Sequence, residues 1–120
     1  MEPHRAERVT ETLREELSEI IEYELSDPRL EGVSVSAVHC QPDMRHAHIL
    51  ILVAPEDTEG KKAIAALTHA AEYIRRELTS RLRLFRIPEL HFAIDTSGGN
   101  ADRVDELLRR VEKNRKKDQN

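Results

Sequence analysis

Hydrophobic residues recur every three or four positions in residues 5–25, as they do along one face of an α-helix. These apolar positions are Ala6, Val9, Leu13, Leu17, Ile20, Ile21 and Leu25. Glutamate is the commonest residue on the other face. Asp27 and Pro28 follow, and the residue before a proline is pushed out of helical geometry. The pattern therefore predicts one long amphipathic helix that ends before Pro28.

Residues 33–40 and 45–53 instead alternate between two faces, which is typical of half-buried β-strands. The second segment places Ala47, Ile49, Ile51 and Val53 on one face and His46, His48, Leu50 and Leu52 on the other. Residues 41–44 (Gln-Pro-Asp-Met) lie between the segments and have the composition of a turn. Two strands joined by a short turn predict a β-hairpin.

Residues 58–84 return to helical spacing. The core positions are Ala63, Ile64, Leu67, Ala70, Ala71, Ile74, Leu78 and Leu82. One helix of this length is long for so small a domain, so we predict a break into two helices near Ala70, Ala71 and Glu72. No residue there enforces a break, because alanine and glutamate are good helix formers.

The last part of the chain predicts a strand at 89–95 and a helix at 101–112, followed by a polar basic tail at 113–120. Three strands with helices on one face predict a two-layer α+β domain that spans residues 1–112. The third strand follows a helical crossover, which allows it to run parallel to its neighbour.

Composition narrows the class of protein. A chain of 120 residues with 38% apolar residues has the length of one domain and is too apolar to be disordered. It contains no apolar run of membrane-spanning length, and its first residues lack the apolar stretch of a signal peptide. Its single cysteine, Cys40, excludes an internal disulfide and a multi-cysteine zinc site. We expect a cytoplasmic protein.

Catalytic and metal chemistry find little support in the sequence. Nucleotide-binding motifs are missing, and the carboxylates of the first helix have the spacing of a solvated face. His46, His48 and His91 are predicted on one outer sheet face. As ligands of a metal ion they would be joined by Asp95, which would supply an oxygen as the fourth ligand. No motif fixes the spacing of these residues as ligands, so we interpret them as surface residues. We expect no enzyme activity, no cofactor and no metal.

Charge is strongly segregated along this chain, whose net charge is −4. Residues 1–32 contain ten acidic residues and four arginines, whereas residues 75–86 contain five arginines and one glutamate. Guanidinium groups match phosphate oxygens in pairs, so the second segment favours contact with a nucleic-acid backbone over pairing with the acidic helix. Candidate contacts are Arg75, Arg76, Arg81, Arg83 and Arg86, with Lys61 and Lys62 at the start of the same helical region.

Several segments in this order resemble the bacterial ribosome-binding factor A family. They are R-x-x-R-V at residues 5–9, LREELSEII at 13–21, SDPRL at 26–30, QPDMRHA at 41–47, YIRRELTSRLRLFRIPELHF at 73–92 and DRVDELL at 102–108. The resemblance implies a type II KH-like fold without the GxxG loop of ordinary KH domains. In the family an Ala-x-Gly step bends the two central helices apart. Here the matching residues are Ala70, Ala71 and Glu72, with glutamate in place of the glycine.

The resemblance further implies a role in ribosome assembly. Such proteins bind the free 30S subunit and its 16S rRNA, assist late maturation that includes 5′-end processing, and leave before translation. By this resemblance the arginines of residues 75–86 would hold phosphates, with Arg45 at the hairpin turn as a further candidate. We expect a monomer.

Two other hypotheses stay open. The first is a protein-interaction adaptor of KH-like fold that uses an exposed sheet edge and does not bind RNA directly. The second is a small metalloenzyme built on His46, His48 and His91. Salt-dependent RNA binding would distinguish the assembly factor from the adaptor, and bound metal would indicate the metalloenzyme.

Overall fold

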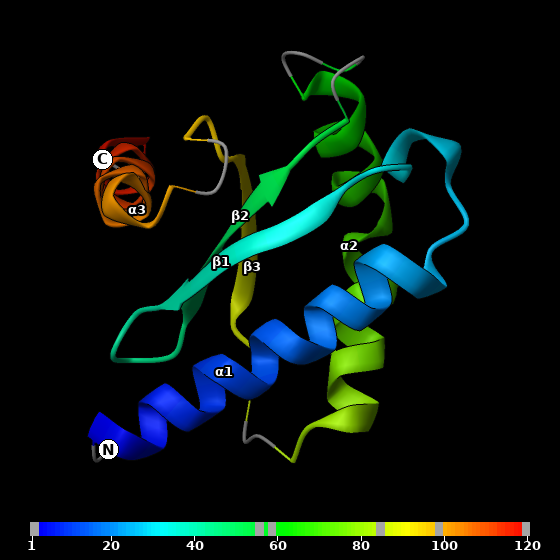
Figure 1. Ribbon diagram of the computed structural model, residues 1–120. Coiled ribbons are helices and arrows are strands. Elements are labelled where there is room, and N and C mark those ends of the chain that lie inside the picture. Colours follow the sequence, from blue (N-terminus) through cyan, green and yellow to red (C-terminus); the bar gives the residue numbers. More distant parts are fainter. Residues whose placement is uncertain (1–2, 55–56, 58–59, 84–85, 98–99, 119–120) are drawn as a thin grey trace.

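A computed structural model describes residues 3–54, 57, 60–83, 86–97 and 100–118 (Figure 1). Within these ranges, three α-helices and a three-stranded sheet form the domain. In chain order the elements are α1 (Pro3–Glu19), the π-helical turn η1 (Ile20–Glu24), the 3₁₀ turn η2 (Pro28–Leu30), β1 (Ser34–Cys40), β2 (His46–Leu52), α2 (Lys61–Arg81), β3 (Glu89–Ile94) and α3 (Ala101–Asp118). The predicted order of helices and strands is confirmed, apart from the division of α2.

The predicted first helix is confirmed, but its last turn is π-helical. The backbone N–H of Leu25 donates to the carbonyl of Ile20 at 3.0 Å, which closes this wider turn. Both Ile20 and Ile21 are buried there. The chain then turns at Asp27, whose side chain accepts a hydrogen bond from the backbone N–H of Arg29 at 2.9 Å.

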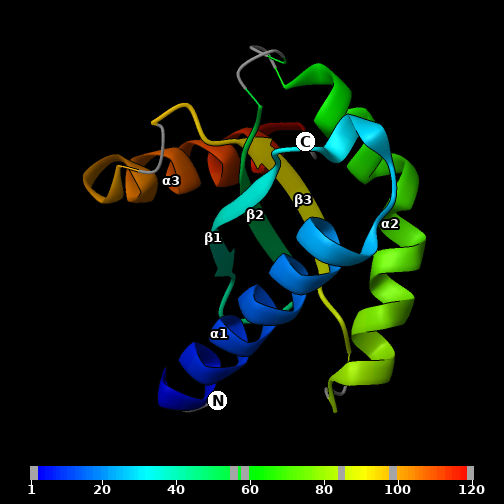
Figure 2. The same cartoon turned by 45° about the vertical axis from the view of Figure 1, so that its right-hand side comes forward.

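The strands pair in the order β1-β2-β3 (Figure 2). The hairpin strands β1 and β2 are antiparallel, whereas β3 follows a helical crossover and pairs parallel to β2. This register places His39 beside His48 and His48 beside His91, and it places His46 beside Glu89. Partners in neighbouring strands share a sheet face. The predicted placement of His46, His48 and His91 on one face is therefore confirmed.

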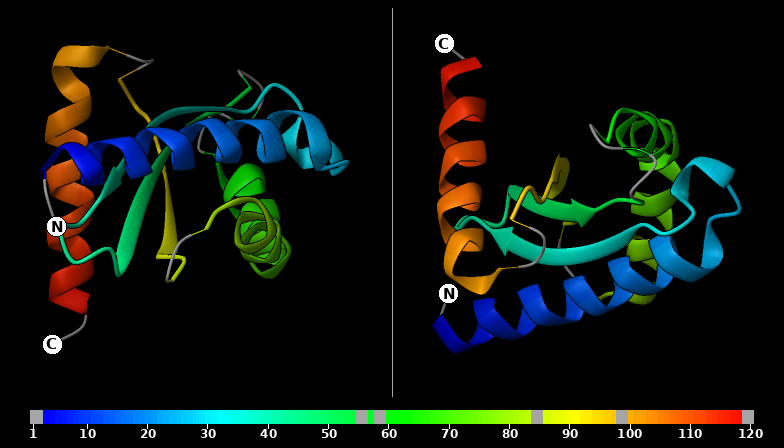
Figure 3. Two further views of the ribbon diagram at one scale, coloured as in Figure 1. Left: turned by 90° about the horizontal axis from the view of Figure 1, so that it is seen from below. Right: turned by 45° about the horizontal axis from the view of Figure 1, so that its top comes forward.

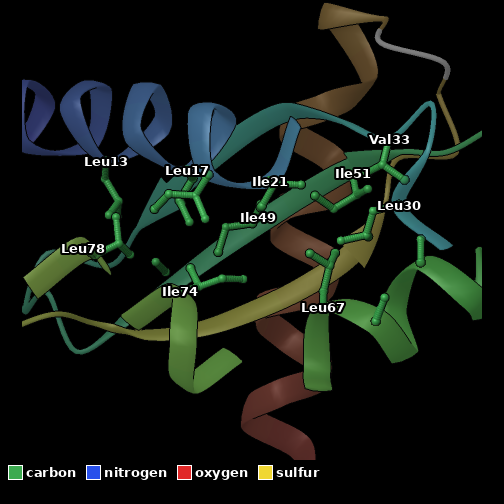
Figure 4. Packing of buried hydrophobic residues seen from close by; sticks show 14 of the residues in the cluster. Leu13, Leu17, Ile21, Leu30, Val33, Ile49, Ile51, Leu67, Ile74 and Leu78 are labelled. Carbon is green, nitrogen blue, oxygen red and sulfur yellow. The ribbon is translucent and has the colours of Figure 1, made fainter. Parts of the chain in front are cut away.

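The hydrophobic core lies between the other sheet face and the helices α1 and α2 (Figure 4). Residues from all three elements are fully buried: Leu13 and Leu17 on α1, Ala47, Ile49 and Ile51 on β2, and Leu67, Ile74 and Leu78 on α2. Helix α1 also contacts α2 directly. The apolar stripes predicted from the sequence are the surfaces that meet here.

The predicted break at Ala70, Ala71 and Glu72 is wrong. The chain forms one continuous α-helix from Lys61 to Arg81. These three residues include no glycine or proline, and alanine and glutamate keep the backbone hydrogen-bond ladder favourable. The ribbon of α2 curves along its length in Figure 2 without interruption. Residues 58, 59 and 84 of the predicted helical range lie outside the described residues.

Helix α2 begins directly after Gly60, which has a left-handed backbone with φ of +69°. A Cβ at this position would lie 2.3 Å from the side chain of Ile94 on β3. Glycine therefore satisfies two requirements, the positive φ and the close approach of β3. The Asp57 carboxylate adds a cap by accepting from the backbone N–H of Ala63 at 3.0 Å.

The last helix covers the sheet face that the sequence prediction left open. Figure 3 shows α3 and α2 on opposite sides of the sheet, and α3 contacts β2. His48 and Leu50 point to this face of β2 and are nevertheless fully buried. The helices therefore do not all lie on one face, and the histidine face is not an outer surface. Helix α3 continues to Asp118, past the predicted end at residue 112, because glutamate, lysine and arginine favour helix.

We expect Glu72→Gly to lower the free energy of unfolding by about 1 kcal/mol, because glycine in a helix interior costs conformational entropy. Glu72→Ala is the matched control and should change stability by less than about 0.5 kcal/mol, since the Glu72 side chain is 82% exposed. Urea denaturation followed by circular dichroism measures both. A stabilising glycine would show that the helix favours a break at this position.

Candidate nucleic-acid interface

The exposed face of α2 carries four of the eight predicted basic residues. Positions 63, 74 and 78 face the core, so positions on the other side of the helix face solvent. Arg75 and Arg76 are exposed near the C-terminal end of α2, and Lys61 and Lys62 are exposed at its start. Lys61 and Arg75 are 14 positions apart, which corresponds to about 20 Å of helix. The two pairs share a face but lie far apart along it.

Two more arginines follow the end of α2. Arg83 and Arg86 are exposed in the connection to β3. Arg8 from α1 and Arg83 both line a mostly apolar hollow, together with Val9, Thr12 and Leu82 among the described residues. The hollow thus joins the first helix to the end of α2. Arg8 could not be predicted from the sequence, because its place at this hollow depends on how α1 packs.

Arg45 lies at the same end of the sheet. The backbone N–H of Glu89 donates to the Arg45 carbonyl at 2.8 Å, which ties the hairpin turn to the start of β3 just after Arg86. The backbone N–H of Arg45 donates to the Asp43 carboxylate at 3.0 Å, and the Arg45 side chain is exposed. Met44 completes the tight turn with φ of 59°. We call Arg75, Arg76, Arg83 and Arg86, together with Arg8 and Arg45, the arginine surface.

Arg81 differs from the other arginines, because carboxylates surround it. It follows Leu78 by three positions and Ile74 by seven, so it projects from the core-facing side of α2 toward α1. Its Nη1 lies 3.2 Å from a Glu16 oxygen, and its Nη2 lies 2.5 Å from a Glu24 oxygen. Glu77 lies 3.5 Å from the same Nη2. Its side chain is only 22% exposed.

The ion pairs of Arg81 link three segments. The hydrogen bond to Glu24, followed by that to Glu16, raises the pKa of the Arg81 guanidinium above its ordinary value. The group is therefore cationic at any pH at which the protein is folded. Its donors are directed at carboxylates of α1, η1 and α2. We therefore assign Arg81 to the packing of α2 on the first helix and leave it out of the arginine surface.

The structure keeps the three histidines of the weighed metal site together but places Asp95 apart from them. His46 and His91 are in contact, with His46 Nδ1 lying 2.9 Å from His91 Nε2, and His48 stacks on His91 with ring centroids 5.2 Å apart. Asp95 lies at the opposite end of β3, where it accepts from the backbone N–H of Ser97 at 2.8 Å. Glu89, which the sequence analysis did not consider, lies beside His46 instead.

Cys40 behaves as the packed residue that its strand position predicts. It is half-buried and packs against the core cluster. Burial raises the pKa of the Cys40 thiol, and a hydrogen bond with Thr10 partly opposes this shift. A thiol with a raised pKa is less often ionised and is a weaker nucleophile. Nothing about Cys40 therefore favours a role as a catalytic nucleophile.

Comparison with known proteins assigns the fold and the family. The family model described as ribosome-binding factor A matches residues 5–108. The chain belongs to the ribosome-binding factor A family. It is 48% identical over 120 residues to ribosome-binding factor A of Solibacter usitatus, in a match that covers all of this chain and 98% of the relative. The Thermomicrobium roseum protein is 41% identical over 119 residues, covering 99% of this chain and 92% of the relative.

Solved members of the family have the same fold. The crystal structure of ribosome-binding factor A from Thermus thermophilus matches with a TM-score of 0.67 and 28% identity, over 74% of this chain and 93% of that one. A Thermus thermophilus homology model fitted into a cryo-EM map of a 30S–RbfA complex matches with a TM-score of 0.60 and 26% identity, over 74% and 93% of the two chains. The predicted KH-like α+β class is confirmed. Within the described residues, no helix combines the length and apolarity needed to cross a membrane.

We expect Arg81→Ala to lower the Tm by several degrees, because it leaves the partly buried carboxylates of Glu16, Glu24 and Glu77 without their shared cation. Arg76→Ala is the matched control, since it removes an exposed arginine from the same helix and should change the Tm little. Thermal unfolding followed by circular dichroism compares the two. An equal effect of both substitutions would contradict the structural role of Arg81.

Proposed function

We propose that this member of the ribosome-binding factor A family acts in the cytoplasm as a small-subunit assembly factor. It binds the free 30S subunit through 16S rRNA and assists late maturation of that RNA, including processing of its 5′ end. The observation that carries the proposal is the arginine surface, whose cations are exposed on a protein of net charge −4. The 30S complex of the Thermus thermophilus relative supports the same kind of partner.

The charge distribution favours a specific contact over general RNA binding. The acidic face of α1 would be repelled by phosphates, so the molecule does not attract RNA equally from every side. Arginine side chains can pair with phosphate oxygens through two parallel N–H donors. Such a pair fixes the orientation of the phosphate and also strengthens the contact. A protein of this kind binds a folded RNA shape in one orientation instead of coating it.

The proposed role is stoichiometric, not catalytic. A monomer that binds one conformation of a folding RNA more tightly than its alternatives shifts the population toward that conformation. The size of the shift is set by the difference between the two affinities. Processing of the 5′ end would then follow from the RNA shape that this protein favours, with the cleavage made by other factors.

Co-sedimentation with separated ribosomal subunits tests the proposed partner. We expect binding to free 30S subunits, with weaker binding to 50S subunits and intact ribosomes, and an affinity that falls steeply as salt rises. Binding that does not depend on salt would favour the protein-interaction adaptor. Equal binding to all particles would contradict the proposal.

The arginine surface is tested by charge reversal. We expect Arg76→Glu with Arg83→Glu to weaken 30S binding by at least about tenfold and to lower the slope of log K against log salt by about two. Lys61→Glu with Lys62→Glu is the matched control, because it makes the same change of charge at the distant end of α2. An equal loss in both double variants would mean that net charge, not this surface, determines binding. Unchanged binding in the arginine variant would exclude the surface.

A further inference from the structure

The start of the parallel pair β2–β3 brings together three side chains that can bind a metal ion. His46 and Glu89 are register partners, and His91 lies two residues after Glu89 on the same sheet face. One nitrogen of His46, one nitrogen of His91 and one carboxylate oxygen of Glu89 all lie within 4.8 Å of one another. The three donors belong to two hydrogen-bonded strands, so the backbone fixes their relative positions.

We propose that His46, Glu89 and His91 form a binding site for a divalent transition-metal ion of the zinc type. This proposal departs from the expectation of no metal drawn from the sequence. It is independent of the proposed role on the 30S subunit, because it rests on the sheet and not on the arginine surface. Two imidazoles with one carboxylate form a donor set that suits zinc and its neighbours better than magnesium or calcium.

The distances fit such an ion with a small adjustment. Two ligand atoms of a tetrahedral zinc ion lie about 3.3 Å apart, since zinc–nitrogen bonds measure about 2.0–2.1 Å. Here His46 Nδ1 lies 2.9 Å from His91 Nε2 and 3.7 Å from Glu89 Oε2. All three ligand atoms lie within 4.8 Å of one another, and the ion would take the place of the hydrogen bond between the two imidazoles. The two histidines would bind through Nδ1 of His46 and Nε2 of His91.

The surroundings of the three residues hold two ligands firmly and leave the third accessible. The His91 ring stacks on His48, with an angle of 24° between the ring planes, and His48 is fully buried. The His46 side chain is only 17% exposed, whereas that of Glu89 is 66% exposed. The imidazoles are therefore preorganised, and Glu89 lies at the side from which an ion would enter. Water would complete the coordination on this open side.

Sequence motifs could not reveal this set of ligands. Zinc motifs are recognised by fixed spacings within one segment, but these ligands come from positions 46, 89 and 91. Only the parallel register of β2 and β3 brings position 46 beside position 89. The ligand set that was weighed and rejected from the sequence also included His48 and Asp95, which the structure places against the His91 ring and at the far end of β3.

The test is isothermal titration of tag-free protein with zinc chloride after removal of metal by a chelator. We expect one zinc ion per chain and a rise in Tm when zinc is present. Changing an outer-shell group commonly weakens metal binding by about 10–100-fold, so removing a direct ligand should weaken it at least about tenfold. Glu89→Gln, His46→Gln and His91→Gln should each show this loss.

His39→Gln and His69→Gln are the matched controls, because both remove a histidine outside the three-residue site and should leave zinc affinity unchanged. Glu89→Gln keeps the test valid if a histidine variant unfolds, since this exposed change leaves the sheet packing intact. Absence of zinc binding by the unaltered chain would overturn the proposal. Undiminished affinity in Glu89→Gln and in the histidine variants that fold would also overturn it, because zinc would then bind elsewhere.

Discussion

The structure depends on the central strand β2, which is hydrogen-bonded on both edges and covered on both faces. Positions 47–51 are all buried, whereas the strands beside β2 are half-buried. One face packs against α1 and α2, and the other holds the histidines under α3. Because β2 also fixes the register of β1 and β3, a shift of one residue would exchange the two faces. The hydrophobic core, the histidine cluster and the hairpin turn therefore all depend on the same pairing register of the three strands.

The second constraint is the contact between α1 and α2, which decides the roles of the arginines. Leu78 and Arg81 lie on the same side of α2, one turn apart. The core-facing side of the helix therefore carries a cation, Arg81, at its C-terminal end. The acidic first helix supplies the carboxylates that surround this cation. Pairing between the acidic and basic segments and an exposed basic surface are thus both present, on different sides of one helix.

The candidate interface could be predicted from the sequence as a set of residues but not as a shape. The arginine content of residues 75–86 pointed to the segment, and the resemblance pointed to the family that the family model shows. Arg8 joins the arginine surface and Arg81 is left out of it, because the place of each depends on how the first helix lies against α2. Lys61 and Lys62 lie on the same exposed face of α2 as Arg75 but outside the arginine surface, since a long uninterrupted segment of helix separates them from Arg75.

The sequence by itself determined the elements, their order and the apolar face of each, because hydrophobic periodicity and helix- and strand-forming tendencies act within a few neighbouring residues. It determined the hairpin, since a short turn leaves two adjacent strands one way to pair. Only the tertiary structure decided that α3 covers the histidine face and that Glu89 meets His46. These features depend on contacts between residues far apart in the chain, whose energies no local pattern contains.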